Sequence, residues 1–212
     1  MRKIYGMAGV TAVMGVLVFS AVGAASASAS SWWVGGEELL SSTALSSTTV
    51  TKVPIRLENP SYAFAFECTG LELKTADIAA HNAGQIEHLV FTSCHSTSSH
   101  CSLVGTKIES KPLKMEAALG EKSPEDKVVL KPVTGKLFME FSVGGTGCTV
   151  AEEGAEIEGQ ATFILPKGRE ESAEQEVQTH AKEGELKGYL GAWTLGGTVK
   201  AKLTSGKKWS FH

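Results

Sequence analysis

Hydrophobic and polar residues alternate with a period of two in several parts of the chain, and this alternation is typical of half-buried β-strands. It is clearest in four segments: SYAFAFEC (61–68), KLFMEFSV (136–143), AEIEGQATFIL (155–165) and TVKAKLT (198–204). Each segment predicts one strand, and Phe138 falls on an outward face. The residues that we expect to face the core are Tyr62, Phe64, Phe66, Cys68, Leu137, Met139, Phe141, Val143, Ile157, Ala161, Phe163, Leu165, Val199, Ala201 and Leu203.

Turn-like segments separate the alternating stretches. Glycine, proline and asparagine interrupt the chain at short intervals, as in ENPS (58–61) and HNAG (81–84). The segments LKMEAALG (113–120) and KVVLKPV (127–133) predict a hairpin whose tip, EKSPED (121–126), is charged. Many short strands with frequent turns predict an all-β fold, either an antiparallel sandwich or a barrel.

Residues 169–186 are the one stretch with a helical composition. Their apolar residues are few and form no stripe at helical spacing. A short exposed helix, a strand edge and a loop all remain open for this segment, and we favour a non-helical structure.

The first 29 residues have the pattern of a secretory signal peptide. Arg2 and Lys3 precede an apolar run, 7–22, and two A-x-A sequences of small residues follow within 25–29. An uncleaved membrane anchor is the alternative, but the apolar run is short and rich in glycine and alanine. Cleavage predicts a secreted, extracellular protein with a single β-rich domain, 30–212, and no further membrane-spanning segment.

Charge and composition limit the partners that the chain can bind. Loss of Arg2 and Lys3 from the 20 basic residues leaves 18 against 23 acidic ones, a net charge of −5. Such a chain has no basic excess to neutralise phosphates, which argues against nucleic acid as a partner. Asp77 and Asp126 are the only aspartates, so calcium loops built on repeated aspartates are not expected. No motif indicates a cofactor.

Four cysteines, Cys68, Cys94, Cys101 and Cys148, predict two disulfides in an exported chain. Three pairings are open from the sequence. The segments before Cys94 and after Cys101 are rich in branched and aromatic residues, which predicts a hairpin closed by a polar loop. Opposed residues of an antiparallel pair have Cα atoms about 4.5–5.5 Å apart, a distance that suits a disulfide. We therefore favour Cys94–Cys101, which leaves Cys68–Cys148.

The same loop, CHSTSSHC (94–101), contains the ligand types that zinc prefers. A metal site made of Cys94, His95, His100 and Cys101 is the weaker alternative. Each cysteine is next to a histidine, and neighbours on a strand point to opposite faces, so four ligands would not converge on one ion. Structural zinc sites also space their ligands further apart.

The order of several motifs resembles predicted secreted, β-rich proteins of high-GC Gram-positive soil bacteria. The motifs are WWVGGEEL (32–39), CTG (68–70), FTSC (91–94), LKPVTGKLFMEF (130–141), GCTVAEEGAEIEGQATFILP (147–166) and GGTVKAKL (196–203). They are structural motifs: cysteines, turn glycines and strand patterns. The resemblance therefore implies a β-rich fold and implies no activity.

Candidate chemistry is sparse in this sequence. It has no G-x-S-x-G, H-E-x-x-H or phosphate-binding glycine motif. Trp33 and Trp193 are candidates for stacking on a sugar ring, although tryptophans in β-proteins also pack into the core. His88 is a candidate partner for a carboxylate.

Three functions remain open. The first is a non-enzymatic, exported module that binds a cell-wall polymer, a carbohydrate or a protein through its surface. The second is a secreted hydrolase that uses glutamate and histidine, and a hollow containing His88 and a carboxylate would favour it. The third is a small metal-binding protein centred on 94–101.

Overall fold

A computed structural model of the protein describes residues 30–49, 54–120 and 126–212. The predicted signal peptide, 1–29, and most of the predicted charged hairpin tip therefore lie outside the described residues. The described elements are β1 Trp32–Val34, β2 Glu37–Glu38, β3 Thr43–Thr49, β4 Ile55–Asn59, the 3₁₀ helix η1 Pro60–Tyr62, β5 Phe64–Ile78, β6 Ala83–Ser96, β7 Ser102–Leu103, β8 Lys107–Ser110, β9 Leu113–Ala118, β10 Asp126–Pro132, β11 Leu137–Gly144, β12 Glu152–Gly159, β13 Ala161–Leu165, β14 Glu174–Gly188, β15 Gly191–Leu203 and β16 Trp209–Phe211. The predicted all-β class is confirmed.

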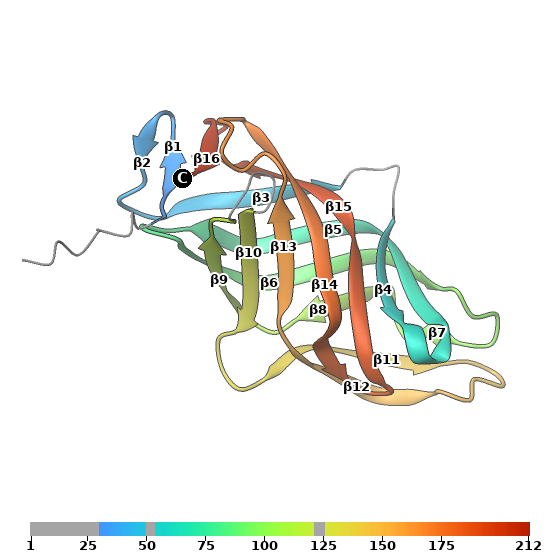
Figure 1. The fold of residues 1–212 in the computed structure, drawn as a ribbon. Helices are drawn as coiled ribbons and strands as arrows, with labels where there is room; N and C mark the ends of the chain where they lie inside the picture. Colours follow the sequence, from blue (N-terminus) through green and yellow to red (C-terminus); the bar gives the residue numbers. More distant parts are fainter. Residues whose placement is uncertain (1–29, 50–53, 121–125) are drawn as a thin grey trace, which may run out of the picture.

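Two long hairpins, β5–β6 and β14–β15, form the main walls of a sandwich-like fold. In Figure 1 the teal and green strands β5 and β6 lie behind the orange and red strands β14 and β15, which run across them. Shorter strands join the hairpins in the order β6–β9–β10–β13–β14 and β15–β3–β5. Further along the hairpins the order is β6–β8–β11–β12–β14 and β15–β4–β5. All these pairs are antiparallel, and they join the two layers along both edges, which protects the strand edges from other chains.

A small sheet with the strand order β16–β1–β2 lies at one end of the sandwich, close to β3 and β9 (Figure 1). Trp32 of β1 and Trp209 of β16 are buried there, with ring centroids 5.8 Å apart. The indole Nε1 of Trp32 donates a hydrogen bond to the carbonyl oxygen of Ala83 in β6 (2.9 Å). The first and last strands of the described chain are thereby packed together against the main sheet.

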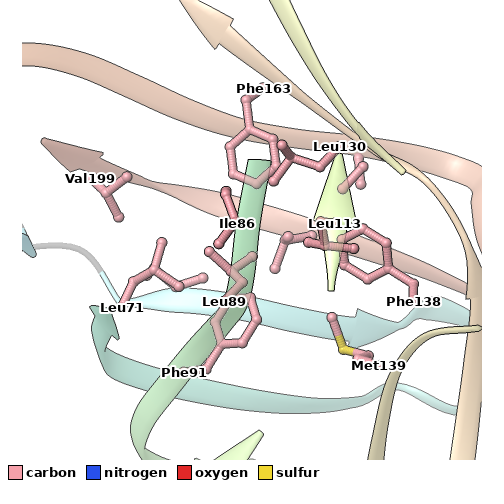
Figure 2. Close-up of a cluster of buried hydrophobic side chains, with 14 of the residues drawn as sticks. Leu71, Ile86, Leu89, Phe91, Leu113, Leu130, Phe138, Met139, Phe163 and Val199 are labelled. Atoms are coloured by element: carbon pink, nitrogen blue, oxygen red, sulfur yellow. The ribbon is translucent and has the colours of Figure 1, made fainter. Parts of the chain in front are cut away.

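The inward faces of the strands form one hydrophobic cluster. Figure 2 shows Ile86 and Leu89 of β6 in one cluster with Leu130, Phe163 and Val199, which come from β10, β13 and β15. The alternation predicted this face correctly at most positions. The predicted inward residues that are buried are Phe64, Phe66, Cys68, Met139, Phe141, Val143, Ile157, Ala161, Phe163, Leu165, Val199, Ala201 and Leu203.

The alternation was wrong at three positions. Tyr62 lies in η1 rather than in a strand and is exposed, because Pro60 begins the turn and the Asn59 side chain accepts a hydrogen bond from the Tyr62 backbone N–H. Phe138 is buried rather than outward, and Leu137 is only half-buried. A register irregularity between Leu137 and Met139 in β11 moves Phe138 to the core side of the strand.

Of three further predicted segments, one differs from its prediction and two agree with it. The stretch 155–165 forms two strands, β12 and β13, because Gly159 has a positive φ of 116° and the chain turns there. The preference against a helix in 169–186 is confirmed, since most of this segment belongs to β14. The hairpin predicted from 113–120 and 127–133 is also confirmed as β9–β10.

The predicted disulfide pairing was wrong. Cys68 is bonded to Cys94 and Cys101 to Cys148, with Cα–Cα distances of 3.9 and 4.8 Å. Strand β6 continues through Cys94 and pairs with β5, where Cys68 is the directly opposed residue. The return strand β8 begins only at Lys107, which is opposite Thr92, so Cys94 and Cys101 are not opposed in a hairpin.

Within the described residues, no helix combines the length and apolar character needed to cross a membrane.

Candidate functional site

The two tryptophans predicted as ligand contacts are placed differently. Trp193 is completely buried and packs edge-to-face against Phe64 and Phe141, with centroids 6.2 and 5.7 Å away. It therefore has no surface for stacking on a sugar, because it fills the core between the layers. Trp33 is half-buried, and its ring meets that of His212 edge-on at 5.6 Å.

His88 lies on β6 in a surface hollow of about 390 Å³, together with Glu109 of β8 and Glu140 of β11. Its Nδ1 is 3.2 Å from Oε1 of Glu109 and 2.8 Å from the carbonyl oxygen of Ser110. Glu140 is directly opposite Glu109 in the β8–β11 pair and forms an ion pair with Lys111 (3.0 Å). The hollow thus gathers a histidine and two carboxylates, each engaged with a neighbour.

The cysteines of the loop 94–101 are not free to bind metal. Both Cys94 and Cys101 are bonded to other cysteines, so neither supplies a thiolate. His95 instead lies 3.5 Å from a carboxylate oxygen of Glu67. Among the described residues, no group of three or more histidine, cysteine, aspartate or glutamate side chains is arranged to hold a metal ion. The structure therefore contradicts the four-ligand metal site that was the weaker alternative for this loop.

The structure also shows a second surface hollow, of about 550 Å³, that we call the lysine groove. Strands β9, β10, β12 and β14 and the turn 133–136 contribute its walls. Its lining residues are Lys114, Lys131, Pro132, Val133, Gly135, Lys136, Glu158, Gly159, Gln160, Gly184, Glu185 and Lys187.

Backbone contacts around Gly159 fix one wall of the lysine groove. A Cβ on Gly159 would lie 2.0 Å from the carbonyl oxygen of Glu185, and the positive φ of 116° also favours glycine. Glycine therefore lets β12 and β14 approach closely. The backbone N–H of Gln160 donates to Glu185 (3.1 Å), and that of Gly159 donates to the carbonyl oxygen of Lys136 (2.9 Å). These two bonds join the β10–β11 turn, the end of β12 and β14.

The charge of the lysine groove is opposite to that of the whole chain. Of the residues that the structure describes, four lysines and two glutamates line it, whereas the chain has a net charge of −3. Lys131 and Lys114 contact the flanking Glu116 at 2.7 and 3.4 Å. The hydrogen bond from Lys131, with a further contribution from Lys114, lowers the pKa of the Glu116 carboxyl, so this group stays ionised.

Lys136 and Lys187 are exposed, and within the described part of the chain neither has an ion-pair partner. Lys187 is opposite Glu158 in the β12–β14 pair, but their charged atoms are not in contact. These two ammonium groups are consequently available to an anion that enters the groove.

The alternation of residues did not reveal the lysine groove. Its four lysines are separated by up to 73 positions in the chain, from Lys114 to Lys187, and each is an ordinary outward residue of a strand or turn. The sequence contained one local signal, a glycine beside each of Lys136 and Lys187, which indicates turns and close backbone contact. That signal does not say which turns meet.

No protein-family model, no curated protein and no solved structure matches the chain.

Proposed function

We propose that the protein is an exported, non-enzymatic binding module whose ligand is an anionic glycan or wall polymer held in the lysine groove. The observation that carries the proposal is the concentration of four lysines around one hollow of about 550 Å³ on an acidic chain. That volume lies within the range of about 300–1,000 Å³ typical of ligand pockets.

Charge defines the class of ligand. Lys136 and Lys187 offer strongly hydrated ammonium groups, which bind carboxylates and phosphates as point charges. Among the described residues, no aromatic side chain lines the lysine groove, so a neutral sugar would lack a stacking platform there. Screening reduces the repulsion from distant acidic residues, since the Debye length is about 8 Å at physiological salt. Binding is therefore expected to be local and sensitive to salt.

Export is supported by two features of the chain. The order of basic, apolar and small residues in 1–29 is that of a secretory signal peptide. All four cysteines form disulfides, which persist in oxidising compartments and are rare in the cytosol. A wall polymer that carries carboxylates or phosphates is a ligand available in that environment.

The experiment compares ligands of different charge. Binding of the purified protein, residues 30–212, is measured by calorimetry against polygalacturonate, a phosphate-bearing teichoic acid and neutral dextran. We expect binding to one or both anionic polymers and none to dextran. Comparing polygalacturonate with the teichoic acid shows whether the groove binds carboxylates, phosphates or both. We also expect the affinity to fall as the salt concentration rises. Equal binding to dextran would contradict a charge-based site.

A double substitution localises the site. Lys136→Ala/Lys187→Ala removes two exposed charges, each contributing roughly 0.5–1 kcal/mol, so the affinity is expected to fall about 5- to 30-fold. Lys207→Ala/Lys208→Ala removes the same charge from exposed positions outside the groove and serves as the matched control. Equal losses in both variants would show that overall charge, rather than the lysine groove, determines binding.

Hydrolysis at the His88 hollow is the second candidate, because this hollow unites His88, Glu109 and Glu140. A carboxylate pair is the usual requirement for glycoside hydrolysis. Release of reducing sugar from polysaccharide substrates would be assayed with the wild-type protein and with Glu140→Gln. Activity that is lost in Glu140→Gln would favour this function, and activity that the variant retains would exclude Glu140 from the chemistry.

A further inference from the structure

One carboxylate of the lysine groove has no positive partner. Glu158 of β12 lines the groove and is exposed, and within the described ranges it takes part in no ion pair. The other glutamate of the lining, Glu185, accepts a hydrogen bond from the hydroxyl of Thr162 (2.8 Å). Glu158 therefore presents an unpaired carboxylate inside a groove whose excess charge is positive.

Strand register places Glu158 between the two unpaired lysines. Lys187 of β14 is directly opposite Glu158, and opposed residues of an antiparallel pair have Cβ atoms about 4.5–5.5 Å apart. On the other side of β12, Glu158 is opposite Leu137, the residue that follows Lys136. The next residue of β12, Gly159, donates its backbone N–H to the carbonyl oxygen of Lys136 (2.9 Å). The order of charges across the groove is therefore cation, anion, cation.

The three charges do not neutralise one another. Cε of Lys187 lies 3.7 Å from the position that a Cβ on Gly184 would occupy, so this side chain extends toward Gly184 and leaves Glu158 unpaired. Lys136, in the turn before β11, is exposed. All three charged side chains line the same hollow, so they are available together to the groups of one ligand.

Electrostatics defines the ligand that complements this order. An anion bound by Lys136 or Lys187 also meets the negative charge of Glu158, which weakens a purely anionic ligand. A positive group of the ligand beside Glu158 replaces that repulsion with a further ion pair.

On the premise of the function proposed above, an anionic polymer in the lysine groove, we propose that this polymer carries a free amino group between two acidic groups. The amino group pairs with Glu158, and the acidic groups pair with Lys136 and Lys187. Phosphate polymers with aminoacyl esters and uronate chains with amino substituents both carry this order of charges.

The test compares each kind of polymer with and without its positive charge. Teichoic acid that bears alanyl esters supplies phosphates, and polygalacturonate with grafted aminoethyl amides supplies carboxylates. Acetylation of the amino groups removes the positive charge and keeps the length of the polymer. Calorimetry in mildly acidic buffer, which preserves the esters, measures binding to the purified protein, residues 30–212.

The expected preference is opposite to that of net charge. The amino form is less negative than the acetylated form, so charge alone would make it the weaker ligand of a basic groove. We expect the amino form of at least one polymer to bind about two- to fivefold more tightly, the range of an exposed ion pair. The polymer that shows the preference identifies the acidic group as phosphate or carboxylate. Equal or weaker binding of both amino forms would overturn the proposal.

Substitution of Glu158 distinguishes this proposal from anion binding in general. Glu158→Gln removes an attraction for the amino form and a repulsion for the acetylated form. It should therefore weaken the first about two- to fivefold and strengthen the second. Glu72→Gln removes the same charge from an exposed position of β5 outside the groove, and it should leave the preference for the amino form unchanged.

The two proposals fail in different ways. If Glu158→Gln strengthened both forms alike, pairing of the amino group with Glu158 would be refuted while anion binding in the groove remained. If neither form bound, or if Lys136→Ala/Lys187→Ala left the affinities unchanged, the proposed function would be refuted together with this inference.

Discussion

The disulfides allow the most quantitative prediction. In the chain-entropy model, the stabilisation grows with the length of the closed loop. Cys68–Cys94 closes a separation of 26 residues and Cys101–Cys148 one of 47, which gives about 3.5 and about 4 kcal/mol. The two loops follow each other in the chain without overlap, so the contributions should add. Cys94→Ser/Cys101→Ser breaks both bonds and is expected to lower the free energy of unfolding by about 7–8 kcal/mol.

This double variant distinguishes the observed pairing from the hairpin pairing. If Cys94 were bonded to Cys101, the same substitutions would open only a short loop, worth about 2.5 kcal/mol. The free energy of unfolding would be measured by urea denaturation, with Cys101→Ser/Cys148→Ser as the control that breaks one bond. A loss near 2.5 kcal/mol in the first variant, together with a loss more than twice as large in the control, would refute the reasoning.

Peptide mapping provides an independent measurement of the pairing. Trypsin cleaves the unfolded, unreduced chain into the cysteine-containing peptides 57–74, 75–107 and 137–167, and the middle peptide contains both Cys94 and Cys101. The observed bonds join all three peptides into one species. The hairpin pairing would instead release 75–107 by itself, with an internal bond.

Three further predictions concern single residues. Burial, followed by the negative charge of Glu152, raises the pKa of Tyr189, whose hydroxyl donates to the carbonyl oxygen of Val150. The folded state therefore holds the Tyr189 proton more tightly than the unfolded state does. The stability that this adds is present below the ordinary pKa of 10.0 and is lost as the pH rises through the higher folded-state pKa. Tyr189→Phe should remove this alkaline dependence, measured by thermal melts. The lowered pKa of Glu116 acts in the opposite sense, because its contribution is present above the ordinary pKa of 4.5 and is lost as the pH falls through the lower folded-state value. Glu116→Gln should flatten the acid limb of stability measured by denaturation, and an unchanged acid limb would contradict the ion-pair assignment. Gly159→Ala should lower the free energy of unfolding by roughly 2–4 kcal/mol, because the new Cβ would meet backbone atoms. Gly135 also has a positive φ but open space around it, so Gly135→Ala should lower the free energy of unfolding by only about 1–2 kcal/mol. Urea denaturation measures both variants.

Much of the fold follows from local sequence. Because neighbouring side chains of a strand point to opposite faces, the alternation in segments such as TVKAKLT correctly predicted which residues are buried. It was wrong where the backbone departs from regular pairing, at the η1 turn and at the irregularity beside Phe138. The alternation in β14 was hidden because two of its buried inward residues, Gln175 and Thr179, are polar.

Tertiary structure alone decided the disulfide partners and the two surface hollows. A cysteine's place on an inward face is a property of its own strand, but its partner depends on the register between strands that are distant in the chain. The lysine groove likewise arises where β9, β10, β12 and β14 meet, and the His88 hollow arises where β6, β8 and β11 meet. Local patterns record the direction of each side chain, whereas these sites depend on distances between strands, which only the folded sheet sets.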